Sequence, residues 1–194
     1  MAVRIGVFAL QGDVHEHLHA FRTALTKRES PGEVVPVRNK RDLAPCDAFV
    51  IPGGESTTIS RLIQKNDLFQ EIREYDGAIF ATCAGMVLLG NDTSDARIQP
   101  LGIMDMGVER NAFGRQKESF ESDIEVKGLN SPFHAVFIRA PVVTRVGQEI
   151  EVLARIPEGI VGVRKELHIA FSFHPELTGD LRLHELFLES LELR

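Results

Sequence analysis

Cys83 stands in sequence surroundings that suit a nucleophile. An apolar run over residues 78–81 leads to Thr82 and Cys83, and a second apolar run at helical spacing begins at Ala84. The pattern predicts a strand, a sharp turn and a helix, in which the strained turn exposes the cysteine at the end of a sheet. Free N–H groups and the positive end of the following helix would favour the thiolate, the reactive form of the side chain. A buried structural cysteine is the alternative, since free cysteines are among the most buried residues.

His174 and Glu176 form a second group that could do chemistry. Pro175 lies between them and disfavours helical backbone at His174, so this stretch is expected to be extended, with both side chains on one side. Glu176 could then fix the tautomer of the imidazole and stabilise its charged form, as the acid does in nucleophile–histidine–acid sites. A loop histidine beside a surface glutamate is the alternative.

Gly53 and Gly54 follow an apolar run over residues 48–51. Two glycines at the end of a strand permit backbone angles that other residues avoid, and they leave N–H groups free to point at an anion. An ordinary tight turn, with Ser56 or Thr57 as helix cap, is the alternative. An oxyanion-binding loop is favoured only together with Cys83.

Strands and helices are expected to alternate through the first half of the chain. The alternation indicates an α/β fold with helices on both faces of a mostly parallel, doubly wound sheet. Ligands on such sheets bind beyond the carboxyl ends of the strands, where both the glycine pair and Cys83 fall. The expected strands cover residues 5–10, 34–37 (near an edge, because of Pro36), 48–51 and 78–81, and the helices cover 13–27, 59–75 with a break near 66–67, and 84–89.

The second half of the chain changes character and is expected to be rich in strands. A polar loop over residues 109–116 contains Arg110 and Arg115, which could bind a carboxylate, although such loops are usually solvated connections. The expected strands cover residues 101–108, 120–127, 136–138, 150–156, 160–164 and 167–173, and a helix over 181–193 follows Asp180.

Three histidines lie in the first predicted helix, which Asp13 is expected to cap. His15 and His19 share a face of that helix, while His17 points nearly opposite. No nearby cysteine completes a metal site, so we expect no metal here and predict a solvated or partner-facing surface for these histidines.

The composition fits an ordinary globular protein. The 194 residues are enough for one domain with a sizeable core, and we expect residues 1–194 to form a single domain. The net charge of −6 argues against nucleic-acid binding, and neither a basic run nor a long apolar segment indicates a membrane. The two cysteines, of which Cys46 is expected to be structural, are too few for a disulfide framework and indicate a cytoplasmic location.

Together these motifs resemble class I glutamine amidotransferases. They are similar in particular to the family of glutaminase subunits of pyridoxal 5′-phosphate synthase (PdxT/Pdx2), and they run in the family's order along nearly the whole chain. The departures are Ala81, where the family's elbow usually has glycine, and a long, charged segment over residues 20–34. The blocks that carry the resemblance are residues 9–13, 52–58, 81–85, 109–116, 137–141 and 172–178.

The resemblance implies a three-layer, flavodoxin-like fold and a role for each matching residue. Cys83, His174 and Glu176 would be the catalytic triad, and the backbone N–H groups of Gly54 and Ala84 would form the oxyanion hole. Gln11 and the neighbouring histidine-rich helix face would contact a partner. The positions that match the family's glutamine contacts are Gly53, Gly54, Glu55, Arg110, Ile138 and Arg139.

The resemblance also implies a reaction and a partner. L-Glutamine would be hydrolysed through a glutamyl thioester, without a cofactor, and the ammonia would pass to a synthase subunit (PdxS/Pdx1) in a complex of up to twelve chains of each kind. Isolated subunits of the family are poorly active until docking arranges the glycine loop. A stand-alone cysteine hydrolase, a DJ-1-like protein and a catalytically dead subunit remain as alternatives.

Overall fold

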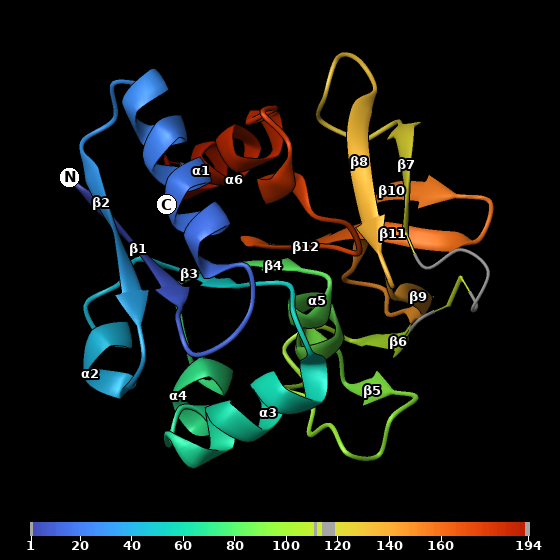
Figure 1. Ribbon diagram of the computed structural model, residues 1–194, viewed down its shortest axis with the longest axis horizontal. Helices are drawn as coiled ribbons and strands as arrows, with labels where there is room; N and C mark the ends of the chain where they lie inside the picture. The colour runs from blue at the N-terminus through green and yellow to red at the C-terminus, as the bar shows by residue number, and fades with distance from the viewer. Residues whose placement is uncertain (1, 111, 114–118, 193–194) are drawn as a thin grey trace.

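A mixed, mostly parallel sheet forms the centre of the molecule, as the computed structural model shows for the described residues 2–110, 112–113 and 119–192 (Figure 1). The strand order is β2-β1-β3-β4-β12-β11-β9-β6-β5, with β10 paired to β11 beside this path. The parallel part consists of β2 (Gly32–Val37), β1 (Val3–Phe8), β3 (Ala48–Ile51), β4 (Ala78–Thr82) and β12 (His168–Phe171). The rest consists of β11 (Gly159–Lys165), β10 (Glu151–Ile156), β9 (Val142–Val146), β6 (Met106–Glu109) and β5 (Asp92–Thr93).

Helices cover both faces of the sheet, which confirms the predicted three-layer α/β/α architecture. In Figure 1, α1 (Val14–Lys27) and α6 (Arg182–Glu192) lie on one side of the sheet, and α3 (Ser56–Lys65) and α4 (Phe69–Arg73) lie on the other, with α5 (Ala84–Leu89). Strands β3 and β4 are buried along their whole length, as the apolar runs over residues 48–51 and 78–81 predict. Each face of the sheet has its own hydrophobic core, and the side chains of β4 alternate between the two. Phe80 packs in the core under α1 and α6, while Ile79 and Ala81 pack in the core under α3, α4 and α5.

A separate two-stranded ribbon, β7 (Ser119–Ile124) and β8 (Phe133–Ile138), stands over the same face as α1 and α6 (Figure 1). Phe120 and Phe137 stack across it with ring centroids 4.5 Å apart. None of the helices in the described ranges combines the length with the apolar character that crossing a bilayer requires.

The predicted strand over residues 101–108 is wrong in its first half. Within this range only β6, which begins at Met106, is a strand. The residues before it are not, because the N–H groups of Leu101 and Met104 donate to the carbonyls of Leu88 and Leu89 at the end of α5. Four elements of the described residues were not predicted: the short helix α2 (Lys40–Leu43), strands β5 and β9, and a 3₁₀ turn over Pro175–Leu177. The other predicted elements are present with shifted ends, β12 for example ending at Phe171, and the helix break near residues 66–67 separates α3 from α4.

The carboxyl ends of β1, β3, β4 and β12 lie along one edge of the sheet because these strands are parallel. The chain segments that leave these four strands therefore meet, although they are far apart in the sequence. They carry the loop that contains Gln11 and Asp13, the glycine pair, Cys83 and His174.

Candidate active site

Cys83 occupies the predicted strained turn. It lies between β4 and α5 with φ 46° and ψ −102°, a conformation that costs a non-glycine residue about 1–3 kcal/mol. Its N–H donates to the carbonyl of Phe171 at 2.8 Å, which ties the turn to β12. A Cβ atom on Gly85 would lie 2.2 Å from the carbonyl oxygen of Ile51, so α5 can follow the turn this closely only with glycine there. Ala81 is fully buried in β4 and leaves the turn intact.

His174 and Glu176 are paired, as predicted. The Nδ1 atom of His174 lies 2.8 Å from Oε1 of Glu176, and both side chains are buried. The expected extended backbone is wrong beyond His174, because Pro175 begins a single 3₁₀ turn, Pro175–Leu177. Proline suits that position, since its fixed φ matches the first residue of a helix and no donor is lost there.

Asp13 is a second carboxylate on the imidazole of His174. Its Oδ2 atom lies 3.2 Å from Nδ1, so the predicted side-chain cap of α1 is not formed. Burial by itself would lower the pKa of His174, but contacts with Asp13, Cys83 and Glu176 raise it above the ordinary value. The imidazolium is therefore favoured, and its buried Nε2 has no hydrogen-bond partner among the described residues.

The glycine pair lies against this group. The N–H of Gly53 donates to Oγ1 of Thr82 at 2.9 Å, and Gly54 has φ +149°, which favours glycine. The next N–H, that of Glu55, donates to the side-chain oxygen of Gln11 at 3.1 Å. Glu55, and not Ser56 or Thr57, caps α3 through its carboxylate.

A cavity of about 330 Å³ opens where these loops meet. Cys83 and His174 line it, together with most of the residues predicted to bind substrate, whereas Glu176 lies behind His174 and Gly53 is not part of the lining. The predicted lining residues are Gln11, Gly54, Glu55, Ala84, Arg110, Ile138 and Arg139, and the others are Asp13, Ser56, Val87 and Pro141.

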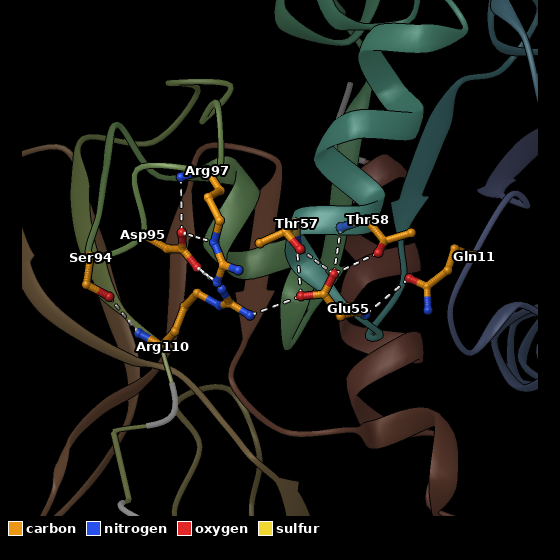
Figure 2. Close-up of polar contacts among 8 residues, drawn as sticks. All are labelled: Gln11, Glu55, Thr57, Thr58, Ser94, Asp95, Arg97 and Arg110. Carbon is orange, nitrogen blue, oxygen red and sulfur yellow. Dashed lines mark hydrogen bonds and ion pairs between the residues drawn. The ribbon is translucent and has the colours of Figure 1, made fainter.

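One wall of the cavity carries both signs of charge. Figure 2 shows Arg110 between two carboxylates, with Nη2 3.1 Å from Oε1 of Glu55 and Nη1 bonded to Asp95. Burial would raise the pKa of Glu55, but hydrogen bonds from Thr57 and Thr58 lower it to about 2. A guanidinium and an ionised carboxylate thus stand side by side at the cavity. Arg115, the other arginine of this loop, lies outside the described residues.

A layer of buried polar side chains lies behind the His174–Glu176 pair, and the sequence analysis did not predict it. His17 is fully buried, so the prediction of a surface position is wrong for this residue, while His15 and His19 are exposed as predicted. Its Nε2 atom lies 3.0 Å from Oγ1 of Thr82 and 3.3 Å from Oε1 of Glu176. The available signal was helical spacing, because His17 precedes the buried Phe21 by one turn of α1.

Asp13, His174 and Glu176 form the one cluster of possible metal ligands among the described residues. Both carboxylates contact the same Nδ1 atom, and they raise the pKa of that ring, whereas a metal requires a neutral imidazole. The cluster is therefore an ion-paired histidine rather than a metal centre.

The arrangement suits attack by a thiolate on a carbonyl compound. A cysteine at the start of a helix and an oriented imidazolium at one small cavity are components of acyl transfer to cysteine. A charged pair on the cavity wall suits a substrate that carries both a carboxylate and an ammonium group.

Comparisons with known proteins point the same way. The model of the SNO glutamine amidotransferase family matches residues 7–193. A protein of Methanoculleus marisnigri named pyridoxal 5′-phosphate synthase subunit PdxT is 60% identical over 194 residues, with 100% of each chain covered. A protein of the same name from Methanoregula boonei is 59% identical, covering 97% of this chain and 99% of its own. A solved structure described as a glutamine amidotransferase superposes with a TM-score of 0.85 at 47% identity, covering 97% of this chain and 98% of its own.

Proposed function

Because the chain belongs to the SNO glutamine amidotransferase family, we propose that it hydrolyses L-glutamine to L-glutamate and ammonia through Cys83, His174 and Glu176. The observation that carries the proposal is the cavity, because Cys83, His174, Glu55 and Arg110 line it together. Family membership speaks against the stand-alone cysteine hydrolase and the DJ-1-like protein. Residues 1–194 would act as one glutaminase domain, since the family match spans most of the chain.

In this mechanism the thiolate of Cys83 attacks the side-chain amide carbon of glutamine. The negative charge that develops on the amide oxygen is stabilised by the N–H groups of Gly54 and Ala84. Nε2 of His174 donates a proton to the departing nitrogen, which leaves as ammonia, and a glutamyl thioester remains on Cys83. Nε2 then removes a proton from water, which attacks the thioester and releases glutamate and the thiolate. Glu176 holds the imidazole throughout.

The charged pair would recognise the backbone end of glutamine. Arg110 would bind the α-carboxylate, because a guanidinium matches that plane with two hydrogen bonds. The ionised Glu55 would bind the α-ammonium group. Ile138 and Arg139 complete the proposed glutamine site, and the carbonyl oxygen of Ile138 lies 3.8 Å from Sγ of Cys83. Gly53 does not line the cavity and would act on the site through the imidazole of His174, against which it lies.

We further propose that the ammonia is passed to a separate synthase subunit that makes pyridoxal 5′-phosphate. The names of the relatives support this step, since they describe subunits of such a synthase. Up to twelve chains of each kind would assemble, with Gln11 at the interface, and the cytoplasm would suit a free catalytic cysteine that must stay reduced. Gln11 already holds the N–H of Glu55, so docking there could rearrange the glycine loop.

Adding the synthase subunit should raise the rate of ammonia release from glutamine by at least about tenfold, or 1.4 kcal/mol in barrier. The expected reason is that docking turns the N–H of Gly54 toward the oxyanion position. The measurement is the initial rate of ammonia formation with and without PdxS, with asparagine as control substrate. Equal rates would reject activation by the partner, and no glutamine turnover in either case would favour the catalytically dead subunit.

A further inference from the structure

Glu176 receives hydrogen bonds from more than the catalytic imidazole. Its Oε1 atom lies 2.8 Å from Nδ1 of His174, 3.3 Å from Oγ1 of Thr82 and 3.3 Å from Nε2 of His17. The carboxylate therefore lies between two imidazole rings, that of His174 at the cavity and that of His17 on α1. Nothing in the reaction described above uses the second ring.

The hydroxyl of Thr82 fixes how this layer is bonded. A threonine hydroxyl has one donor and two acceptor positions. Thr82 accepts from the N–H of Gly53 at 2.9 Å and donates to Glu176, so its remaining acceptor position faces Nε2 of His17 at 3.0 Å. His17 must then carry a proton on Nε2, which makes it a donor to both Thr82 and Glu176.

His17 occupies a place where an apolar residue would pack with less cost. Its side chain is 0% exposed, it packs edge-on against Phe80 with ring centroids 6.2 Å apart, and its Nδ1 atom has no hydrogen-bond partner among the described residues. A buried polar group is destabilising unless its hydrogen bonds repay the lost hydration. Of its two ring nitrogens, only Nε2 has hydrogen-bond partners in the described part of the chain. Any favourable contribution of His17 must therefore come from the contacts of Nε2 with Thr82 and Glu176.

We infer that His17 is a positioning residue of the active site, which acts through Thr82 and Glu176 to hold the imidazole of His174 in its catalytic orientation. The inference rests on the proposed glutaminase function. It joins helix α1, strand β4 and the glycine loop to the triad in one buried network, and it requires no contact between His17 and glutamine.

A role in positioning predicts a change in pH dependence. The groups that face His174 and Glu176 are Asp13 before α1, His17 on α1, Cys83 after β4 and His184 on α6. Removing His17 takes away the donor that holds Thr82 and Glu176 in place, so the Glu176 carboxylate can turn away from Nδ1 of His174 and its contact with the imidazolium weakens. His174 then loses its proton at lower pH, and the alkaline limb of kcat/KM moves to lower pH.

The test compares His17→Leu with His17→Gln in the complex with the synthase subunit. We expect His17→Leu to lower kcat about tenfold, with KM for glutamine little changed, and to shift the alkaline limb. Glutamine can place an amide N–H near the position of Nε2, so His17→Gln should recover most of both effects. Nitrogen NMR of labelled histidine should show His174 losing its proton at lower pH in His17→Leu than in wild type.

His184→Leu is the matched control. His184 is also fully buried, packs on Phe80, and has no hydrogen-bond partner for either ring nitrogen among the described residues. Its replacement changes core packing without removing a donor from Glu176, so stability can change but the alkaline limb should stay. If His17→Leu does not fold, Thr82→Val against Thr82→Ser asks the same question, with the shift expected only for valine.

The outcomes separate the two proposals. An unchanged kcat, pH profile and NMR titration in His17→Leu would overturn the role of His17, as would an equal shift in His184→Leu. A wild type that releases no ammonia from glutamine would reject the proposed function, and the NMR titration would still decide whether His17 acts on His174.

Discussion

Replacing Cys83 with alanine should lower glutamine hydrolysis in the presence of the synthase subunit by about 10⁴-fold or more. The substitution removes the atom that forms the thioester and leaves no other thiol at the cavity. Folding should be preserved, since the hydrogen bond of Sγ to the carbonyl of Ile138 is weak, at 3.8 Å, and alanine meets the same backbone strain. The measurement is ammonia release by wild type and variant, with binding of the synthase subunit followed in the same samples.

Cys46→Ala is the control for this result. Cys46 is the other free cysteine, and its Sγ contacts the carbonyl of Asp42 at 3.2 Å, away from the cavity. Burial raises the pKa of the Cys46 thiol, which keeps it unreactive. The Cys46→Ala enzyme should retain its rate. Turnover by Cys83→Ala at even a few per cent of the wild-type rate would contradict the assignment of the nucleophile.

Replacing Gly53 with alanine should lower the rate by about 10²-fold, because a misplacement of a catalytic group by about 1 Å has effects of that size. A Cβ atom on Gly53 would lie 2.3 Å from Cε1 of His174 and 2.8 Å from Oδ2 of Asp13. The imidazole of His174, which lines the cavity, must move. The contacts are with side chains, so the fold should survive while the catalytic geometry does not.

Gly179→Ala serves as the matched substitution. Nothing lies within 4 Å of a Cβ atom built on Gly179, so the added methyl group meets open space and the rate should not change. Circular dichroism and thermal unfolding of the two variants separate lost activity from lost structure. A folded Gly53→Ala enzyme with wild-type kcat would show that this glycine does not set the position of His174.

The strands that position the site could be predicted because a strand that is buried on both faces has a nearly continuous apolar sequence. Strand β3 and residues 78–81 of β4 are apolar runs, and each is followed by small or chemically active residues. Where the sequence misled, tertiary hydrogen bonds decided the outcome. Residues 101–105 have the composition of a strand, but their N–H groups complete the end of α5 instead. Strand β9 was missed, and its pairing with β6 and β11 identifies it in the folded chain.

For the site, the sequence placed the residues that follow strands but not those that support them. Cys83, His174 and the glycine pair could be located because parallel strands end at one edge. Asp13 occupies a capping position in the sequence, yet its side chain turns to His174, which lies far along the chain. His17 was predicted to be on the surface with its exposed neighbours, since its partners Thr82 and Glu176 become visible only in the folded chain.

The most direct test of the central claim is covalent labelling by an electrophilic glutamine analogue, in which a chloromethyl ketone replaces the carboxamide. With the synthase subunit present, peptide mapping should find one label per chain, on Cys83, and excess glutamine should slow the labelling. Cys46 should remain unmodified. Labelling of another residue, or an enzyme that remains active and unlabelled at Cys83, would contradict the account.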